Sequence, residues 1–248
     1  MQNVPVVVKI GGHDLETEGF LDQLAEAVAH VVQERPCVLV HGGGKTVSRL
    51  LRQVGIEPVY VRGQRVTTAE ALDVVEMALS GLVNKRITLA LWQHGVDALG
   101  MSGVDRGLLR VQPWGEDMGR VGRIVAVRTD ALHALFAERV VPVISPISQG
   151  PQGSYNVNAD HAASAIAAAL NAAYALFLTN VPGVLVGAEV APQLTVTQAQ
   201  DLIARGVIHG GMIPKVNAAL EAVRQGVRKA IITNLGGMEG GTGTVFTA

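Results

Sequence analysis

The segments VPVVVKIGG (residues 4–12) and CVLVHGGG (residues 37–44) decide the fold class of this chain. Each is a short apolar run that ends in glycines, and between them apolar residues recur at helical spacing. Apolar runs without alternation are typical of strands buried on both faces, as in a parallel sheet covered by helices. The two segments therefore predict a strand–helix–strand unit. Both glycine turns should lie near the carboxyl ends of the strands, where open α/β sheets bind ligands.

The alternation of strands and helices continues through the chain. Further strands are expected at residues 140–144, 174–179, 229–233 and 244–246, and helices at residues 46–54, 68–93, 159–172, 197–205 and 213–225. The runs 108–111 and 121–127 are interpreted as a hairpin that forms a flap, and the glycine-rich residues 236–243 as a flexible loop. We predict an α/β fold, a three-layer αβα sandwich around a mainly parallel open sheet. It forms one domain (residues 1–248) with at most two lobes.

Composition and charge exclude several classes of protein. The 248 residues include 20 Lys and Arg against 21 Asp and Glu, a net charge of −1, which argues against a nucleic-acid scaffold or a polybasic membrane binder. The single cysteine, Cys37, excludes an intramolecular disulfide framework and a cysteine metal cluster, and it fits a cytoplasmic protein. The first twelve residues show no signal peptide, and residues 162–178 are too rich in alanine to span a membrane.

The two glycine turns allow backbone N–H groups to approach an anion closely, and a helix that starts after such a turn adds its dipole. Two familiar nucleotide-binding motifs fail here. A P-loop ending at residues 44–46 would need glycine where Leu39 stands, and the dinucleotide pattern that fits Gly42 and Gly44 meets Val47 in place of its third glycine. The turns therefore form either an anion site of another kind or simple tight connections.

Charged and amide side chains accompany these turns. Lys9 lies inside an apolar run, where a lysine is costly to bury unless it is paired, and Lys215 opens a helix after a glycine-containing segment. Two such lysines could neutralise a transferring phosphoryl group, whereas a solvated surface position is the ordinary alternative. Asn156 and Asn158 alternate on an extended segment and so face one side. Asp160 falls in the first turn of the next helix, either as an N-cap or to hold the lysines by charge.

Taken together, these segments resemble the amino acid kinase family. The matching stretches occur in the order and spacing of the family and cover essentially the whole chain. They are VVKIGG (7–12), VLVHGGGK (38–45), GQRVT (63–67), VNK (83–85), GRVGRI (119–124), YNVNADHAA (155–163), LTNVPGVL (178–185) and GMIPKVNAAL (211–220). Each stretch alone is a modest signal, but the ordered set is highly specific.

The resemblance implies ATP-dependent phosphorylation of the side-chain carboxylate of N-acetyl-L-glutamate, a step of arginine biosynthesis. An N-lobe (about residues 1–170) would bind the acyl amino acid and form a dimer, and a C-lobe (about residues 171–248) would bind ATP. Mg²⁺ would be carried mostly by ATP oxygens, because no carboxylate cluster in the sequence looks like a dedicated cage. The acceptor carboxylate is already ionised at neutral pH, so neither a general base nor a covalent intermediate is needed.

The resemblance also assigns individual residues. Lys9 and Lys215 would stabilise the transferring phosphoryl group, with Asp160 organising them. Arg65 would bind the substrate α-carboxylate, Asn156 and Asn158 would hold the acyl-amino end, and Gly43 and Gly44 would give N–H contacts to the substrate. The residues expected on the phosphate and nucleotide side are Gly11, Gly12, Thr179, Asn180, Gly183 and Leu185.

Assembly and acyl specificity are further expectations. Some family members carry an N-terminal helix that links dimers into rings. Here the first strand is expected from about residue 4, so the chain resembles the short, dimeric, arginine-insensitive type, and we expect a homodimer through residues 68–93. The alternatives are a kinase for N-succinylglutamate or for carrier-linked aminoadipate or glutamate in lysine biosynthesis, and a non-catalytic nucleotide sensor. A nitrogen-signalling protein is a conceivable partner. An acidic carrier protein would need a basic docking surface. Five arginines around the hairpin could form one, or they are ordinary solvated residues of its strands: Arg106, Arg110, Arg120, Arg123 and Arg128.

Overall fold

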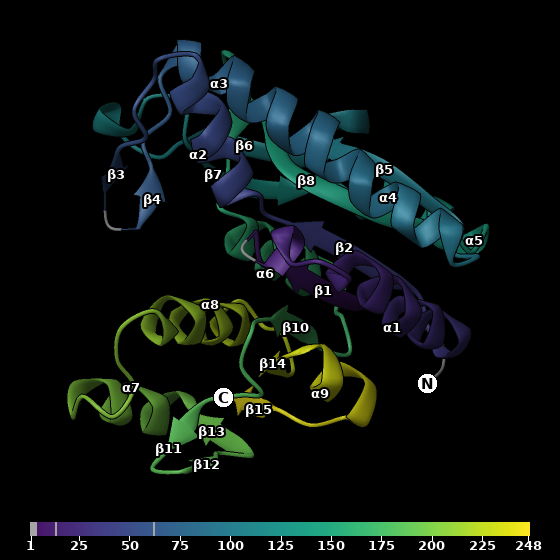
Figure 1. Ribbon diagram of the computed structural model, residues 1–248, viewed down its shortest axis with the longest axis vertical. Coiled ribbons are helices and arrows are strands. Elements are labelled where there is room, and N and C mark those ends of the chain that lie inside the picture. Colours follow the sequence, from purple (N-terminus) through teal and green to yellow (C-terminus); the bar gives the residue numbers. More distant parts are fainter. Residues whose placement is uncertain (1–3, 13, 62) are drawn as a thin grey trace.

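One mainly parallel sheet runs through the whole molecule (Figure 1). The computed structural model of the chain describes residues 4–12, 14–61 and 63–248, so residues 1–3 of the opening segment lie outside the described part. In spatial order the strands are β13 (Gln193–Thr195), β15 (Thr244–Thr247), β14 (Ala230–Thr233), β10 (Ala175–Leu178), β1 (Val6–Ile10), β2 (Cys37–His41), β8 (Val141–Gly150), β6 (Leu109–Pro113) and β7 (Gly122–Val127). Strands β5 (Ala98–Gly103) and β9 (Gly153–Asn156) also pair with β8.

Helices cover both faces of this sheet. They are α1 (Phe20–Glu34), α2 (Gly44–Gln53), α3 (Ala69–Glu76), α4 (Asn84–Gln93), α5 (Thr129–Ala137), α6 (Ala159–Ala169), α7 (Val196–Ala204), α8 (Met212–Arg224) and α9 (Leu235–Gly240). Side chains of β1 alternate between the faces: Val7 packs in the core cluster that holds α6 and α8, whereas Val6 and Val8 pack in the cluster that holds α1 and α4. The predicted αβα sandwich is confirmed. Within the described residues, no helix combines the length and the apolar character needed to cross a membrane.

The long helical segment predicted at residues 68–93 is present, but it is not uniform. Thr68 caps its start by accepting a hydrogen bond from the N–H of Ala71 at 3.1 Å. Between α3 and α4 the chain forms a π-helix at Met77–Val83. A π-helical turn holds more residues than an α-helical one, so it changes which side chains face inward after it. An apolar pattern with helical spacing does not reveal this insertion.

The hairpin predicted at residues 108–127 is confirmed as β6 and β7, which pair antiparallel. Its interpretation as a flap is wrong, because β6 also pairs with β8 and so belongs to the main sheet. A smaller hairpin projects from the sheet instead, formed by β3 (Tyr60–Val61) and β4 (Gln64–Arg65). Figure 1 shows this small hairpin beside α2 and away from the main sheet.

The glycine-rich residues 236–243 are largely folded, which corrects the expectation of a flexible loop. They contribute most of α9, whose first turn is capped by Asn234 through a 2.9 Å hydrogen bond from the N–H of Gly237. A Cβ atom at Gly237 would lie 2.8 Å from the carbonyl oxygen of Thr242, and one at Gly243 would lie 2.7 Å from that of Ile232. The glycines therefore permit close backbone packing against β14 rather than mobility.

Candidate active site

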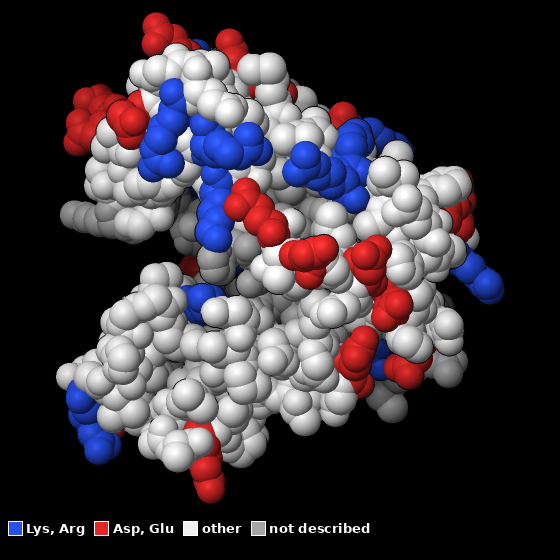
Figure 2. All heavy atoms as spheres, in the orientation of Figure 1, with Lys and Arg blue, Asp and Glu red and all other residues white. Residues whose placement is uncertain are grey.

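A cavity of about 220 Å³ lies at the carboxyl ends of β1 and β2. Its walls come from the two glycine turns, the start of α2, the β3–β4 hairpin and the segment that joins β9 to α6. The hairpin and α2 also form one wall of the hollow that Figure 2 shows, and α8 lies across it. The position is the one that α/β sheets use for ligands.

The two glycine turns are in direct contact at the floor of this cavity. Parallel pairing places Ile10 opposite His41, so the turns that follow meet at the same edge of the sheet. A Cβ atom at Gly12 would lie 2.6 Å from the nitrogen of Gly44 and 2.7 Å from that of Gly43, so only glycine fits at position 12. α2 starts at Gly44 without a side-chain cap among the described residues, and its first N–H groups are therefore available to an anion.

Lys9 and Asp160 form an ion pair at the edge of the cavity. The Lys9 Nζ lies 2.8 Å from the Asp160 Oδ1, with side chains only 16% and 24% exposed. The cap of α6 is Asn158, whose Oδ1 accepts the N–H of Asp160 at 2.8 Å. Because Asn158 caps the helix, the carboxylate of Asp160 is left free to hold Lys9. The structure thus decides between the two interpretations of Asp160 in favour of the charge pair.

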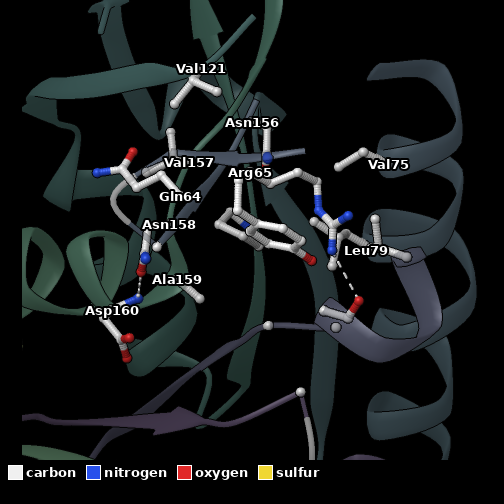
Figure 3. A pocket seen from close by; sticks show the side chains of 18 of the residues that line it. Gln64, Arg65, Val75, Leu79, Val121, Asn156, Val157, Asn158, Ala159 and Asp160 are labelled. Carbon is white, nitrogen blue, oxygen red and sulfur yellow. Dashed lines mark hydrogen bonds between the residues drawn. The ribbon is translucent and has the colours of Figure 1, made fainter. Parts of the chain in front are cut away.

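Arg65 faces the cavity from the opposite side (Figure 3). Its Nη2 donates to the carbonyl oxygen of Gly44 at 3.1 Å and to the Ser48 hydroxyl at 2.8 Å, and its guanidinium lies 4.8 Å from the ring centre of Tyr60. Partial burial lowers the pKa of Arg65, although a guanidinium stays charged at neutral pH. Its Nη1 is buried without a hydrogen-bond partner among the described residues. Such a group favours a carboxylate ligand.

Asn156 and Asn158 both line the cavity between Arg65 and Asp160 (Figure 3). The Asn156 amide donates from Nδ2 to the Thr67 hydroxyl at 3.1 Å, which fixes its orientation. Since Asn158 uses Oδ1 as the helix cap, its Nδ2 is the group that remains for a ligand. The two side chains can therefore offer an acceptor and a donor, as an amide ligand requires.

Apart from Gly12, which lines the cavity, the residues expected on the phosphate and nucleotide side lie elsewhere. Lys215 lies in the first turn of α8, half-buried, and does not line the cavity, as is also true of Gly11. The Thr179 hydroxyl donates to the Asn180 side chain at 3.2 Å, just after β10. Gly183 and Leu185 lie further along, before and within the short ribbon of β11 (Leu185–Val186) and β12 (Glu189–Val190). The structure thus brings together the acceptor-side residues with Lys9 and Asp160, but not Lys215 or this second group.

The apolar part of the lining could not be predicted from the sequence. Valine, leucine and proline side chains cover the cavity between the polar groups, and Gln64 and Tyr60 complete the hairpin wall. The apolar members are Val47, Val75, Leu79, Val121, Pro146 and Val157. Because such residues also fit helices, strands and their core, no local pattern assigns them to a cavity, although Val121, Val157 and Gln64 lie inside the matched stretches.

Known proteins share both the sequence and the fold of this chain. A model of the amino acid kinase family matches residues 5–234. The chain belongs to the amino acid kinase family. Of its relatives in the family, an acetylglutamate kinase of Roseiflexus castenholzii is 54% identical over 94% of this chain and 90% of the relative.

A second relative and a crystal structure are also similar to this chain over nearly its whole length. An acetylglutamate kinase of Chloroflexus aurantiacus is 47% identical over 97% of this chain and 96% of the relative. The crystal structure of smu.665 from Streptococcus mutans superposes with a TM-score of 0.82, at 30% identity, over 98% of both chains. The resemblance inferred from the ordered motifs is therefore confirmed across the whole length.

Proposed function

We propose that this protein transfers the terminal phosphoryl group of ATP to the side-chain carboxylate of N-acetyl-L-glutamate in arginine biosynthesis, in the cytoplasm. The observation that carries the proposal is the placing of two cationic groups, Lys9 and Arg65, at one small cavity with glycine N–H donors and two amides between them. An N-acylated acidic amino acid presents the matching groups, with a carboxylate and an amide on its α-carbon and a second carboxylate at the end of its side chain. The similarity to two acetylglutamate kinases supports the same substrate.

The residues divide the work as follows. Arg65 holds the α-carboxylate, and Asn156 and Asn158 hold the acyl-amino group. Lys9 and the N–H groups of the glycine turns meet the side-chain carboxylate and offset its repulsion from an incoming phosphoryl group. Asp160 keeps the ammonium group of Lys9 at the right place through their 2.8 Å contact. No side chain has to remove a proton, because a carboxylate is ionised at neutral pH.

The nucleotide side is part of the same proposal. Residues up to about 170 bind the acyl amino acid, and residues from about 171 bind ATP with its Mg²⁺, which together supply the phosphoryl group and reduce its charge. Lys215 reaches the transferring group from α8. No group of three or more His, Cys, Asp or Glu side chains in the described part of the chain could hold a metal ion. The backbone and side chains assigned to the phosphates and nucleotide are those of Gly11, Gly12, Thr179, Asn180, Gly183 and Leu185.

The carrier-linked alternative has less support. Arg128 forms an ion pair with Asp130 at 2.9 Å, and Arg120 donates to the carbonyl oxygen of Gln152 at 2.7 Å. These two members of the basic hairpin cluster thus have internal partners, and the curated relatives described above are named for the free acetylated amino acid.

A coupled assay of ADP release tests the proposal. Mg-ATP is supplied with N-acetylglutamate, glutamate, N-acetylaspartate or N-succinylglutamate in parallel. We expect selective turnover of N-acetylglutamate. Silence with all four acceptors, from folded protein that binds ATP, would contradict the proposed substrate and favour a carrier-linked one.

Replacing Arg65 should weaken acceptor binding without slowing the chemical step. We expect Arg65→Met to raise the KM for N-acetylglutamate by about 10–100-fold, the value of a charge-assisted hydrogen bond, with kcat and the KM for ATP nearly unchanged. Arg65→Lys is the matched control, since it keeps the charge but loses the forked geometry of the guanidinium. Its KM for N-acetylglutamate should lie between those of the wild type and Arg65→Met. Steady-state kinetics measure this, and an unchanged acceptor KM in Arg65→Met refutes the assignment.

We also propose a homodimer through the helix that runs from α3 to α4. α4 exposes Leu89 and Trp92 by 59% and 60%, and Met77 at the start of the π-helix is also exposed. We expect wild-type protein to have the mass of a dimer by light scattering, and Leu89→Glu to give monomers, because a charge would be buried in the contact. Val125→Glu, at an apolar residue of β7 that is 51% exposed, is the control and should stay dimeric. A monomeric or hexameric wild type would contradict this proposal.

A further inference from the structure

His41 lies at the end of β2, fully buried, directly before the second glycine turn. Its Nδ1 lies 3.0 Å from the carbonyl oxygen of Gly42, and its Nε2 lies 3.0 Å from the Nδ2 of Asn84. Burial lowers the pKa of His41 to about 4, so the ring is neutral at physiological pH and carries one N–H. The mechanism described above gives this side chain no part in substrate contact.

The partners of Asn84 determine which ring nitrogen carries the hydrogen. Its Nδ2 also faces the carbonyl oxygens of Val143 at 2.8 Å and Met101 at 3.3 Å, and its Oδ1 accepts from the Lys85 ammonium at 3.1 Å. The amide therefore presents a donor to His41, whose Nε2 must accept. The hydrogen then lies on Nδ1 and is donated to the carbonyl oxygen of Gly42.

The π-helix before Asn84 brings this amide to the glycine turn. Leu79 and Val83 of the same π-helix cover Gly43 so closely that a Cβ atom there would lie 2.7 Å and 3.2 Å from their methyl groups. On the other side of Asn84, Gly100 leaves the space that its Oδ1 occupies, since a Cβ atom at Gly100 would collide with that oxygen. The second glycine turn is thus held by one helical segment in two ways, through the Leu79 and Val83 side chains against Gly43 and through Asn84 against His41.

We propose that His41, oriented by Asn84, is a positioning residue that sets the direction of the Gly43 N–H toward the reacting groups. In a trans peptide the carbonyl oxygen of Gly42 and the N–H of Gly43 point in opposite directions. A carbonyl held by the buried imidazole therefore turns the Gly43 N–H away from the core and toward Gly12, with which it lines the cavity. This inference rests on the proposed function, because it concerns the donor that meets the acceptor carboxylate and the phosphoryl group.

Two substitutions at His41 separate positioning from packing. His41→Leu removes the donor, whereas His41→Asn keeps an N–H close to the position of Nδ1. We expect His41→Leu to lower kcat by about 10–100-fold, as for a small misplacement of a catalytic donor, with both KM values within about threefold. His41→Asn should recover most of kcat. The rates are measured with the acceptor that the wild type phosphorylates, and circular dichroism and thermal unfolding check that each variant is folded.

The outcomes are distinct. A kcat of His41→Leu within threefold of wild type, a rise in KM alone, or a kcat of His41→Asn as low as that of His41→Leu overturns the inference. If His41→Leu does not fold, His41→Gln replaces it, since its amide lies too far along the side chain to mimic Nδ1, and the same comparison with His41→Asn decides.

A measurement without turnover keeps this inference separate from the proposed function. In ¹⁵N-histidine-labelled wild-type protein, His41 should show a protonated Nδ1 and an unprotonated Nε2 with no titration between pH 5.5 and 8, and Asn84→Leu should change the Nε2 signal. A protonated Nε2, or an imidazole that titrates in this range, overturns the inference even where no acceptor is turned over. An inactive wild type with the expected His41 signals would instead count against the proposed substrate alone.

Discussion

Lys9→Met should lower kcat by about 10²–10³-fold, the loss typical of removing one preorganised group that stabilises developing charge. Lys9 lines the cavity together with Asp160, and its Nζ lies 2.8 Å from the Asp160 Oδ1. Without it, the side-chain carboxylate of the acceptor and the phosphoryl group repel each other with no compensating charge, and Asp160 adds its own. Stopped-time ADP release at saturating substrates measures the effect.

Two further variants are controls for the effect of Lys9→Met on kcat. Lys229→Met removes an exposed lysine directly before β14 and should leave kcat unchanged. Asp160→Asn leaves Lys9 charged but not held, so its kcat should fall less than that of Lys9→Met. A near-wild-type rate in folded Lys9→Met would remove the basis of the proposed mechanism.

Lys215→Met should give the second large effect, again a fall in kcat of about 10²–10³-fold. Lys215 belongs to α8, the helix that lies across the hollow, and it does not line the cavity, so its loss should leave the KM for N-acetylglutamate close to that of the wild type. Arg224→Met, in the last turn of the same helix, is the matched control and should keep full activity. If Lys215→Met keeps its kcat, or loses only acceptor binding, then α8 does not deliver a cation to the reaction.

The main strands could be predicted because their burial on both faces leaves a clear mark on the sequence. VVVKI and CVLVH show it plainly, and both are strands. β5 could not be predicted as an apolar run because its sequence, ALGMSG, contains glycines, and Gly100 leaves the space that Asn84 occupies. α5 was missed because it is a short helix with few buried residues. The π-helix leaves no mark because apolar spacing describes α-helical turns only.

The candidate site could be predicted in its charged members but not in its assembly. Lys9 stood out as a cation in an apolar strand, and burial of that kind calls for a partner, which Asp160 provides. That Asn158 caps α6 while Asp160 pairs with Lys9 could be decided only from the geometry of the helix start. A positioning role of His41 and Asn84 could not be predicted, because each alone looks like an ordinary polar residue of the core. Only the fold brings these residues, 43 positions apart, into contact.

The seam between β1 and β10 governs how the two sides of the sheet can move. Parallel pairing from Val7 opposite Ala175 to Lys9 opposite Phe177 joins the strands on the α2 side to those on the α8 side. This ladder excludes a hinge between the two sides at the seam, and a relative rotation that keeps its hydrogen bonds is a twist of the sheet about the seam. Points on the axis of a rotation are displaced least. Lys9 is one of the residues on this seam, so a twist of the sheet about it would displace the backbone of Lys9 less than α2 on one side or α8 on the other.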